Sequence, residues 1–142
     1  KILRRTKINE LPQLLNILVG DMSIIGPRPL TLESFDLYTS DSQQVIKTVK
    51  PGLSGIGSIV FRGEEDFMNS SKISKNFYEK VIAPYKGQLE EWYVLNKSLY
   101  TYFLAILVTI WTVLVPNTKM IWIVFKDLPK PPKELKNDLH YS

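Results

Sequence analysis

The chain has 142 residues, 44% of them hydrophobic, which is enough to build the core of one ordinary domain. It contains no cysteine and a single histidine, His140, which excludes a disulfide framework, a thiolate zinc site and catalysis by cysteine or histidine. The net charge of +4 comes from basic residues gathered near both ends, and it favours anionic partners such as phosphate, lipid headgroups or nucleic acid. A solvated basic surface explains the same charge, so charge alone assigns no function.

The first predicted element is an amphipathic helix over residues 9–19. Its apolar residues recur at spacings of three and four, which is the pattern of one helix face: Leu11, Leu14, Leu15, Leu18 and Val19. Pro12 falls in the first turn, where a missing N–H costs nothing. The pair Gly20-Asp21 is expected to end the helix.

A stiff loop follows at residues 26–29, where Gly-Pro-Arg-Pro places a proline on each side of Arg28. Such a loop presents the arginine at low entropic cost. A short polar helix is predicted near residues 32–38. The glycine-rich turn at residues 50–57 leads into Ser-Ile-Val-Phe at 58–61, which is the best strand candidate in the sequence.

Residues 62–75 are polar and are predicted to form a loop, and a helix is expected from residue 75 to a break at Pro84. A second helix is then predicted over residues 85–97. The basic, proline-rich stretch at 126–133 is predicted to be extended, lying either against anionic headgroups or in solvent.

Residues 98–118 carry no charge and are numerous enough to span a bilayer. Their strongly apolar part is only about 13 residues long and contains Thr109 and Thr112 before Pro116 ends it, which favours a buried or interfacial helix over a spanning one. Trp111 is expected in the protein core.

The first thirty residues hold the best candidates for chemistry. Arginine side chains grip phosphate oxygens in pairs, a helix N-terminus adds N–H donors, and a carboxylate can hold a Mg²⁺ ion. The residue types for such a diphosphate site are all present: Arg4, Arg5, Glu10, Asp21 and Arg28. Ordinary capping and surface roles account for each residue taken singly.

The stretch 3–30, from Leu-Arg-Arg-Thr-Lys to Gly-Pro-Arg-Pro-Leu, closely resembles the signature of the bacterial sugar transferase family, the monotopic polyprenyl-phosphate phosphoglycosyl transferases. Lys-Pro-Gly-Leu-Ser-Gly at 50–55 resembles the proline-glycine turn of that family. Arg62 falls where the family often carries an arginine, and Trp92-Tyr93 with Thr109 resemble its closing helices. The resemblance covers about residues 1–116.

The resemblance implies an enzyme that transfers a sugar-1-phosphate from a UDP-sugar to undecaprenyl (polyprenyl) phosphate. It implies Mg²⁺ as cofactor and the cytoplasmic face of the bacterial inner membrane as location. Such transfer initiates the synthesis of capsule, O-antigen, exopolysaccharide or glycoprotein glycans. A homodimer is left open, and nucleic acid is not expected as a partner because no recognised motif accompanies the basic runs.

In that family the helix begins with an Asp-Glu dyad, in which the Asp is the nucleophile and the Glu helps to bind Mg²⁺. Carried across, Glu10 would hold the metal, and Arg4, Arg28 and Arg62 would contact substrate. The position of the nucleophile, however, is Asn9. An amide has no ionised form and is a poor nucleophile, so the usual covalent intermediate is not expected.

Three explanations for Asn9 stay open: an Asp→Asn change made to silence the enzyme, a natural variant that uses another carboxylate or direct attack by the lipid phosphate, and a family member that has lost catalysis. The alternative function is a catalytically silent module at the membrane periphery that binds lipid phosphate or a partner of the same pathway.

The expected fold is α+β and helix-dominated, the monotopic membrane-associated sugar transferase fold, with amphipathic interfacial helices and a small strand element. Residues 1–142 are expected to form one catalytic domain cut from a longer protein, with residues 117–142 as its basic, proline-rich tail. The re-entrant membrane helix that the family carries at its N-terminus is expected to lie outside these 142 residues.

Overall fold

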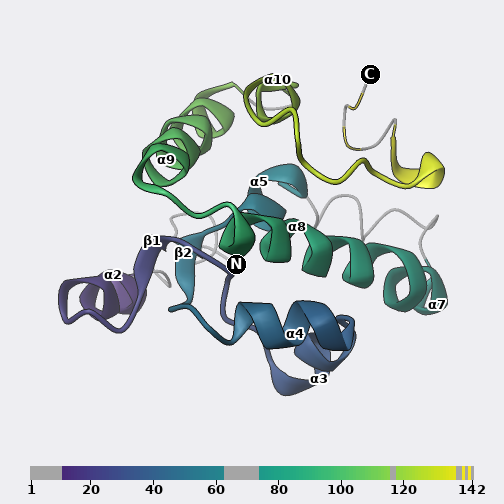
Figure 1. Ribbon diagram of the computed structural model, residues 1–142, viewed down its shortest axis with the longest axis horizontal. Helices are drawn as coiled ribbons and strands as arrows, with labels where there is room; N and C mark the ends of the chain where they lie inside the picture. The colour runs from purple at the N-terminus through teal and green to yellow at the C-terminus, as the bar shows by residue number, and fades with distance from the viewer. Residues whose placement is uncertain (1–10, 63–73, 116–117, 137–138, 140, 142) are drawn as a thin grey trace.

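The computed structural model describes residues 11–62, 74–115, 118–136, 139 and 141. Helices dominate this part of the chain, together with one small sheet of two strands (Figure 1). The prediction of a helix-dominated fold with a small strand element is therefore confirmed. The elements in chain order are α2 (Leu11–Leu18), β1 (Ser23–Ile25), α3 (Leu32–Asp36), α4 (Ser40–Ile46), β2 (Gly52–Ser54), α5 (Ile56–Val60), α7 (Lys75–Phe77), η2 (Tyr78–Ile82), α8 (Ala83–Leu95), α9 (Leu99–Leu114), α10 (Met120–Val124) and η3 (Lys133–Leu135).

Helix α8 runs through the middle of the molecule, with α3 and α4 on one side and α5, α9 and α10 on the other (Figure 1). One face of this helix and of the turn before it supplies four core side chains: Ile82, Tyr85, Leu89 and Tyr93. Their spacing of three and four residues is that of one helix face. They pack in a single apolar cluster with residues of α5, α9 and α10.

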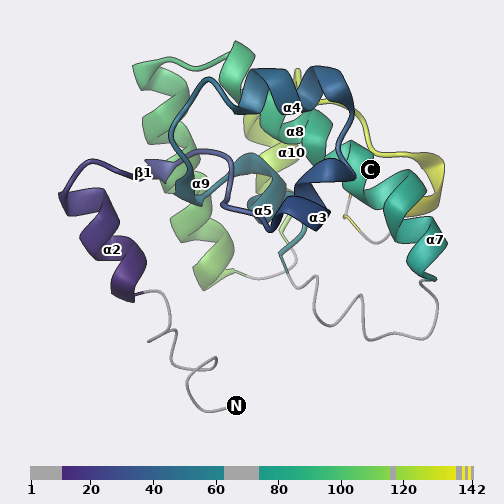
Figure 2. The ribbon, with the colours of Figure 1, turned by 90° about the horizontal axis from the view of Figure 1, so that it is seen from below.

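Helix α2 and its ending follow the sequence prediction. Pro12 lies in the first turn of the described helix. Gly20 has a φ of 88°, a left-handed conformation that glycine adopts without steric cost. The N–H groups of Asp21 and Met22 both donate to the carbonyl of Asn16, at 2.9 and 3.1 Å. Figure 2 shows α2 at the edge of the molecule, joined to the rest through β1.

The strands are not where the sequence suggested. β1 and β2 pair in parallel, with Ser23 opposite Gly52 and Ile25 opposite Ser54, and α3 and α4 form the crossover between them. The strand predicted at 58–61 is wrong, because that run belongs to α5 and its C-cap. The buried residues of α5 include Ile56, Ile59 and Val60, a helical spacing within a run that is rich in β-branched residues.

The predicted break at Pro84 is absent. The chain passes from α7 through the π-helical turn η2 directly into α8, and Pro84 lies in the first turn of α8. Proline removes one helical hydrogen bond and collides with the carbonyl four residues earlier. A π turn, which is wider than an α turn, accommodates the proline without ending the helix.

Helix α9 presents an unusual division of its side chains. The face packed on the protein holds small or polar residues, namely Thr101, Ala105, Val108 and Thr112. The opposite face leaves large apolar side chains exposed, among them Leu99, Phe103, Leu107, Ile110 and Leu114. Trp111, which was expected in the core, is 44% exposed, so that prediction is wrong. Within the described residues, no helix has the length and apolar character needed to cross a bilayer.

The C-terminal stretch packs on the core, which corrects the expectation that it lies on headgroups or in solvent. Leu128, Leu135 and Leu139 are buried in the main apolar cluster. The hydroxyl of Tyr85 donates to the carbonyl of Pro129 at 2.9 Å, and the indole N–H of Trp122 donates to the carbonyl of Leu139 at 2.9 Å. The tail is thus part of the folded unit, although Lys126 is exposed on its surface.

Candidate functional site

The parallel sheet joins the two motifs that the sequence singled out. The N–H of Ser23 donates to the carbonyl of Pro51, and the N–H of Gly26 donates to the carbonyl of Ser54, each at 2.9 Å. Beyond the strand end, the N–H of Gly52 donates to the carbonyl of Pro27, also at 2.9 Å. The Gly-Pro-Arg-Pro loop and the Lys-Pro-Gly turn therefore form one hydrogen-bonded unit.

Glycine is required where the two motifs meet. A Cβ on Gly26 would lie 2.9 Å from the carbonyl oxygen of Lys50 and 3.1 Å from the nitrogen of Gly52. A Cβ on Gly52 would collide with the backbone of Gly26 itself. Since the close atoms are backbone atoms, neither side can move aside without breaking the strand pairing. This pair of glycines fixes where the loop begins.

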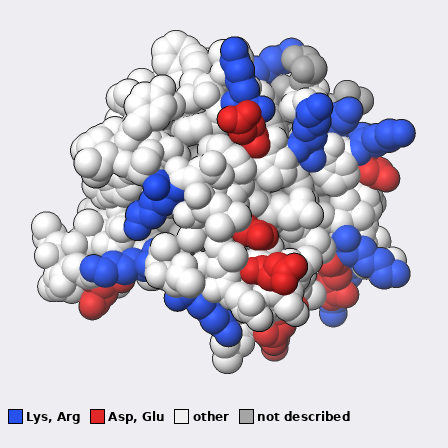
Figure 3. All heavy atoms as spheres, viewed as in Figure 1, with Lys and Arg blue, Asp and Glu red and all other residues white. Residues whose placement is uncertain are grey.

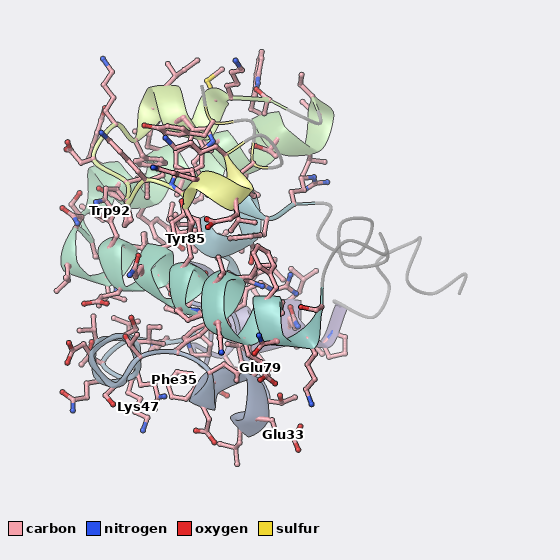
Figure 4. All side chains as sticks on the ribbon, turned by 90° about the vertical axis from the view of Figure 1, so that its right-hand side faces the viewer. Glu33, Phe35, Lys47, Glu79, Tyr85 and Trp92 are labelled. Atoms are coloured by element: carbon pink, nitrogen blue, oxygen red, sulfur yellow. The ribbon has the colours of Figure 1, made fainter. Side chains whose placement is uncertain are left out.

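Arg28 extends from this rigid base into solvent. It lines an open pocket of about 160 Å³, together with residues of the same loop, of α3 and of the end of α4: Pro27, Pro29, Leu30, Phe35, Ile46, Lys47, Val49 and Pro51. The ammonium nitrogen of Lys47 lies 5.6 Å from the ring centroid of Phe35, and Figure 4 shows these two side chains together below α8. The pocket thus combines two cations with an apolar wall, which suits a ligand that is both anionic and partly apolar.

A carboxyl group is buried behind the loop. Glu90 of α8 is only 4% exposed, and its Oε1 accepts a hydrogen bond of 3.1 Å from the N–H of Gly57 in α5. Its Oε2 is buried and has no hydrogen-bond partner within the part of the chain that the structure describes. Burial raises the pKa of Glu90 to about 8, against the opposing effects of the Gly57 N–H and the charges of Lys86 and Arg28.

Tyr93 is a titratable neighbour of this carboxyl. Burial, with smaller contributions from the neighbouring Tyr102 and Glu90, raises the pKa of Tyr93 to about 12. The hydroxyl of Tyr102 accepts a hydrogen bond from the N–H of Ile24 in β1 at 3.3 Å. Ser54 Oγ of β2 and Thr109 Oγ1 of α9 are 3.3 Å apart. Polar contacts from α9 therefore hold both strands in place.

The predicted site residues fall into two groups. Arg4, Asn9 and Glu10 lie outside the described residues, so their predicted roles stay predictions. Arg28 and Arg62 are described, and both side chains are exposed. Because β1 and β2 are parallel, the chain leaves both strands at the same end of the sheet. The loop with Arg28 follows β1, and α5 followed by Arg62 comes after β2. Helix α5 has five residues and is about 7.5 Å long, and it lies in the chain between β2 and Arg62.

The described residues contain no cluster of three potential metal ligands. Across residues 11–62, 74–115 and 118–136, no three acidic or histidine side chains come together as they would around a metal ion. Glu10, the predicted ligand, directly precedes the first described residue. The carboxylate of Glu90 is shut into the core, and Asp21 is exposed on a turn. The predicted role of Glu10 in holding Mg²⁺ is therefore untested.

Glu90 was not among the site residues predicted from the sequence. It follows Leu89 directly and precedes Tyr93 by three residues, so it falls on the apolar face of α8. Two features of the sequence could have identified Glu90. It is an acid on the apolar face of a predicted helix, and the chain also contains two closely spaced glycines, Gly55 and Gly57. The neighbouring Glu91 points elsewhere, since its Oε2 accepts a 2.7 Å hydrogen bond from the hydroxyl of Ser42 in α4.

Comparison with known proteins gives the same assignment as the motifs. The sequence model of the family described as "Bacterial sugar transferase" matches residues 1–116. The chain is 36% identical over 115 residues to the uncharacterized sugar transferase EpsL of Bacillus subtilis, which covers 81% of this chain and 48% of that protein. The chain thus spans about half the length of this relative.

Two further relatives have names that state a reaction. A UDP-N-acetylgalactosamine-undecaprenyl-phosphate N-acetylgalactosaminephosphotransferase of Aeromonas hydrophila is 33% identical over 117 residues, 80% of this chain and 24% of that protein. A UDP-glucose:undecaprenyl-phosphate glucose-1-phosphate transferase of Klebsiella pneumoniae is 44% identical over 69 residues, 46% of this chain and 15% of that protein. With the family match over more than half of its length, the chain belongs to the bacterial sugar transferase family.

Proposed function

We propose that this chain is catalytic-domain sequence of a phosphoglycosyl transferase, which moves a sugar-1-phosphate from a UDP-sugar to polyprenyl phosphate at the cytoplasmic face of a bacterial membrane. The observation that carries the proposal is the locked pair of motifs at the sheet edge, which presents Arg28 at the rim of a cationic pocket. The names of the relatives from Aeromonas and Klebsiella supply the class of reaction.

The chemistry of the pocket supports a nucleotide sugar as ligand. A guanidinium forms paired hydrogen bonds with phosphate oxygens, and the Lys47 ammonium adds a second positive charge on the same pocket. Arg28 is attached to a loop that two prolines and the Gly26 contact hold rigid, so little entropy is lost when it binds. In this scheme the loop binds and orients the diphosphate, and Mg²⁺ held by Glu10 would neutralise it.

The surface of α9 supports a lipid environment. Its large apolar side chains face outward, and the surface over α9 in Figure 3 is almost free of charged groups. Leu15 and Leu18 of α2 and Val19 directly after it are exposed in the same way. Exposed apolar surface of this extent is costly in water and stable in the interface of a bilayer. A polyprenyl phosphate, whose chain resides in the membrane, would then reach the site from that side.

Asn9 supports the second candidate, a catalytically silent module of the same pathway. The family's nucleophile is an Asp, and an amide cannot form the acyl-phosphate that this nucleophile forms. A chain with Asn9 would still present Arg28 and the apolar faces of α2 and α9. It would bind the lipid phosphate or the nucleotide without turning it over.

Turnover of the full-length protein decides between the two. Release of uridine monophosphate is measured from UDP-sugars in the presence of polyprenyl phosphate and Mg²⁺, for the protein with Asn9 and for the Asn9→Asp variant. Turnover by the variant alone identifies Asn9 as a disabled nucleophile and makes this chain the silent module. Turnover with Asn9 that is abolished by Glu10→Ala identifies a working transferase without the covalent step. Absence of turnover in both proteins would exclude the transferase.

The role of Arg28 is tested by binding, which requires no turnover. We expect Arg28→Ala to weaken UDP binding to the full-length protein by about tenfold, equivalent to about 1.4 kcal/mol for a lost charge-assisted contact. The matched control is Lys126→Ala, which removes an exposed positive charge from the C-terminal stretch. Equal affinity of the Arg28→Ala variant and the unmodified protein would contradict the proposed phosphate contact.

A further inference from the structure

Phe35 of α3 is an aromatic side chain to which the proposed function gives no role. Its ring is only partly buried, and it lines the same pocket as Arg28. The ammonium nitrogen of Lys47 lies over the ring, 5.6 Å from its centroid (Figure 4). Because both residues line the pocket, the face of the ring that Lys47 covers is directed into the pocket. A flat apolar face thus lies beside the proposed phosphate contact.

The ring belongs to a well-packed part of the fold. The ring centroids of Phe35 and Tyr38 are 5.9 Å apart, with a tilt of 53° between the planes. Tyr38 is buried against α8, where a Cβ on Gly87 would lie 3.0 Å from its Cγ. The side-chain amide of Gln43 in α4 donates to the carbonyl of Tyr38 at 2.9 Å. Because these contacts fix the turn after α3, a flat ligand can bind to Phe35 with little loss of conformational entropy.

The pocket has the volume of one planar ring. It measures about 160 Å³. An apolar protein cavity of about 150 Å³ holds one benzene molecule. A pyrimidine base consists of a single six-membered ring, whereas a purine carries a second ring fused to the first. The size of the pocket therefore favours a pyrimidine over a purine.

The charges on the pocket suit the remainder of a nucleotide. Among the described residues that line it, the two charged ones, Arg28 and Lys47, are both basic. A contact between a cation and an aromatic ring at an exposed position is weak. Stacking of a base on an aromatic ring is stronger. A base can therefore displace the Lys47 ammonium from the Phe35 ring, and the ammonium can then turn to the phosphates.

We propose that Phe35 is the platform on which the pyrimidine base of the nucleotide stacks, with Lys47 moving from the ring to the phosphates that Arg28 binds. The inference rests on the proposed function, because it takes the pocket at Arg28 as the nucleotide site. Each residue receives a separate part of the ligand, namely the base for Phe35 and the phosphates for Arg28 and Lys47. Phe35 is thus a specificity-determining residue, which selects the base and does not touch the reacting phosphorus.

Two ligands separate the base from the phosphates in isothermal titration calorimetry of the full-length protein. One is UDP, and the other is inorganic pyrophosphate, which has no base. We expect Phe35→Ala to weaken UDP binding by about tenfold and to leave pyrophosphate binding unchanged, since only stacking is lost. Phe35→Tyr keeps an aromatic ring and should retain UDP affinity. The matched control is Phe103→Ala, which removes an exposed phenylalanine of α9 and should leave UDP affinity unchanged.

Lys47 and the size of the base are tested with the same method. Lys47→Ala should weaken the binding of both UDP and pyrophosphate, because the ammonium contacts phosphate in the complex. Unchanged pyrophosphate affinity in this variant would overturn the proposed movement of Lys47. The unmodified protein should bind UDP more tightly than ADP, because adenine is larger than the pocket. Equal affinities for UDP and ADP would overturn the match of the pocket to a single ring.

The results for Phe35 and Arg28 distinguish this inference from the proposed function. If Arg28→Ala weakens UDP binding and Phe35→Ala does not, the stacking role is overturned and the proposed function stands. If Phe35→Ala weakens UDP and pyrophosphate binding equally, the ring only supports the fold, and the stacking role is again overturned. If Phe35→Ala weakens UDP binding alone while Arg28→Ala has no effect, the stacking role stands and the proposed phosphate contact is wrong. Absence of UDP binding to the unmodified protein would overturn both.

Discussion

Helices α8 and α9 follow each other in the chain and use their side chains in opposite ways. α8 contains Lys86, Glu90 and Glu91, yet it forms the centre of the core. α9 carries no charged residue, yet it turns its largest apolar side chains outward and packs on the protein through small and polar ones. Average apolarity therefore does not predict which helix is buried in the protein.

The difference shows what each helix is adapted to. A helix surrounded by protein must have side chains whose shapes fit those of its neighbours. It can include one acid if glycines leave space for the carboxyl, as Gly55 and Gly57 do for Glu90. A helix with a broad exposed apolar face needs a lipid or protein environment that covers this face. For α9 the proposed surroundings are those of the membrane interface.

The largest effect is expected from one leucine on each helix. Leu89→Ala in α8 removes a fully buried side chain and should lower the free energy of unfolding by about 2–5 kcal/mol. Leu107→Ala in α9, which removes the same atoms from an exposed position, should change it by less than about 0.5 kcal/mol. Urea denaturation of the full-length protein in mild detergent measures both. Similar losses would mean that α9 is packed against protein on both faces.

The second prediction concerns the small-residue face of α9. Ala105 is fully buried, so Ala105→Leu should overfill the contact with the core and cost about 1–3 kcal/mol of unfolding free energy. Phe103→Leu, on the exposed face, is the control and should be nearly neutral. The same denaturation experiment applies. A neutral Ala105→Leu would show that α9 is not seated on the core through this face.

The third prediction is that the free energy of unfolding depends on pH through Glu90 of α8. The pKa of Glu90 is raised from 4.5 to about 8 by folding, so between these values the unfolded chain releases the proton while the folded chain keeps it. The free energy of unfolding should therefore fall as pH rises through this window, by up to about 1.4 kcal/mol per pH unit, and be unaffected below it. Glu90→Gln should remove this part of the slope. An unchanged slope in the variant would show that another group titrates.

The smallest effect is expected on binding of the protein to membranes. Leu107→Ser should weaken binding of the full-length protein to lipid vesicles by about tenfold, or about 1.4 kcal/mol, because one apolar side chain loses its place in the bilayer. Gln88→Ser, an exposed polar position on α8, is the control. Vesicle flotation measures the bound fraction. Equal binding of the two variants would remove α9 from the proposed membrane contact.

Much of the fold could be predicted from local patterns. The helix up to Leu18, its end at Gly20 and the short helix from Leu32 follow from apolar spacing, left-handed glycine and an N-cap, all of which act within a few residues. The strands could not be placed in this way. Each has three residues, and their pairing depends on contacts between glycines 26 and 52, far apart in sequence.

The candidate site was predictable to the same degree. Arg28 stands out because two prolines flank it, and the structure places it on a rigid base at a pocket. Glu90 does not stand out, because an acid in a helix is ordinarily solvated, and its burial depends on α5 packing against α8. The prediction that Trp111 lies in the core was wrong for a related reason, since an aromatic side chain is common both in a protein core and at a membrane interface.

The packing of the C-terminal stretch has a consequence for biosynthesis. The family match ends at residue 116, but the apolar cluster that contains Ile25 and Ile56 is completed by Leu135 and Leu139. During translation the core therefore stays open until residue 139 has left the ribosome, and the apolar face of α9 is already exposed by then. During this interval the unfinished core and the apolar face of α9 are exposed together, which is the condition under which nascent chains aggregate.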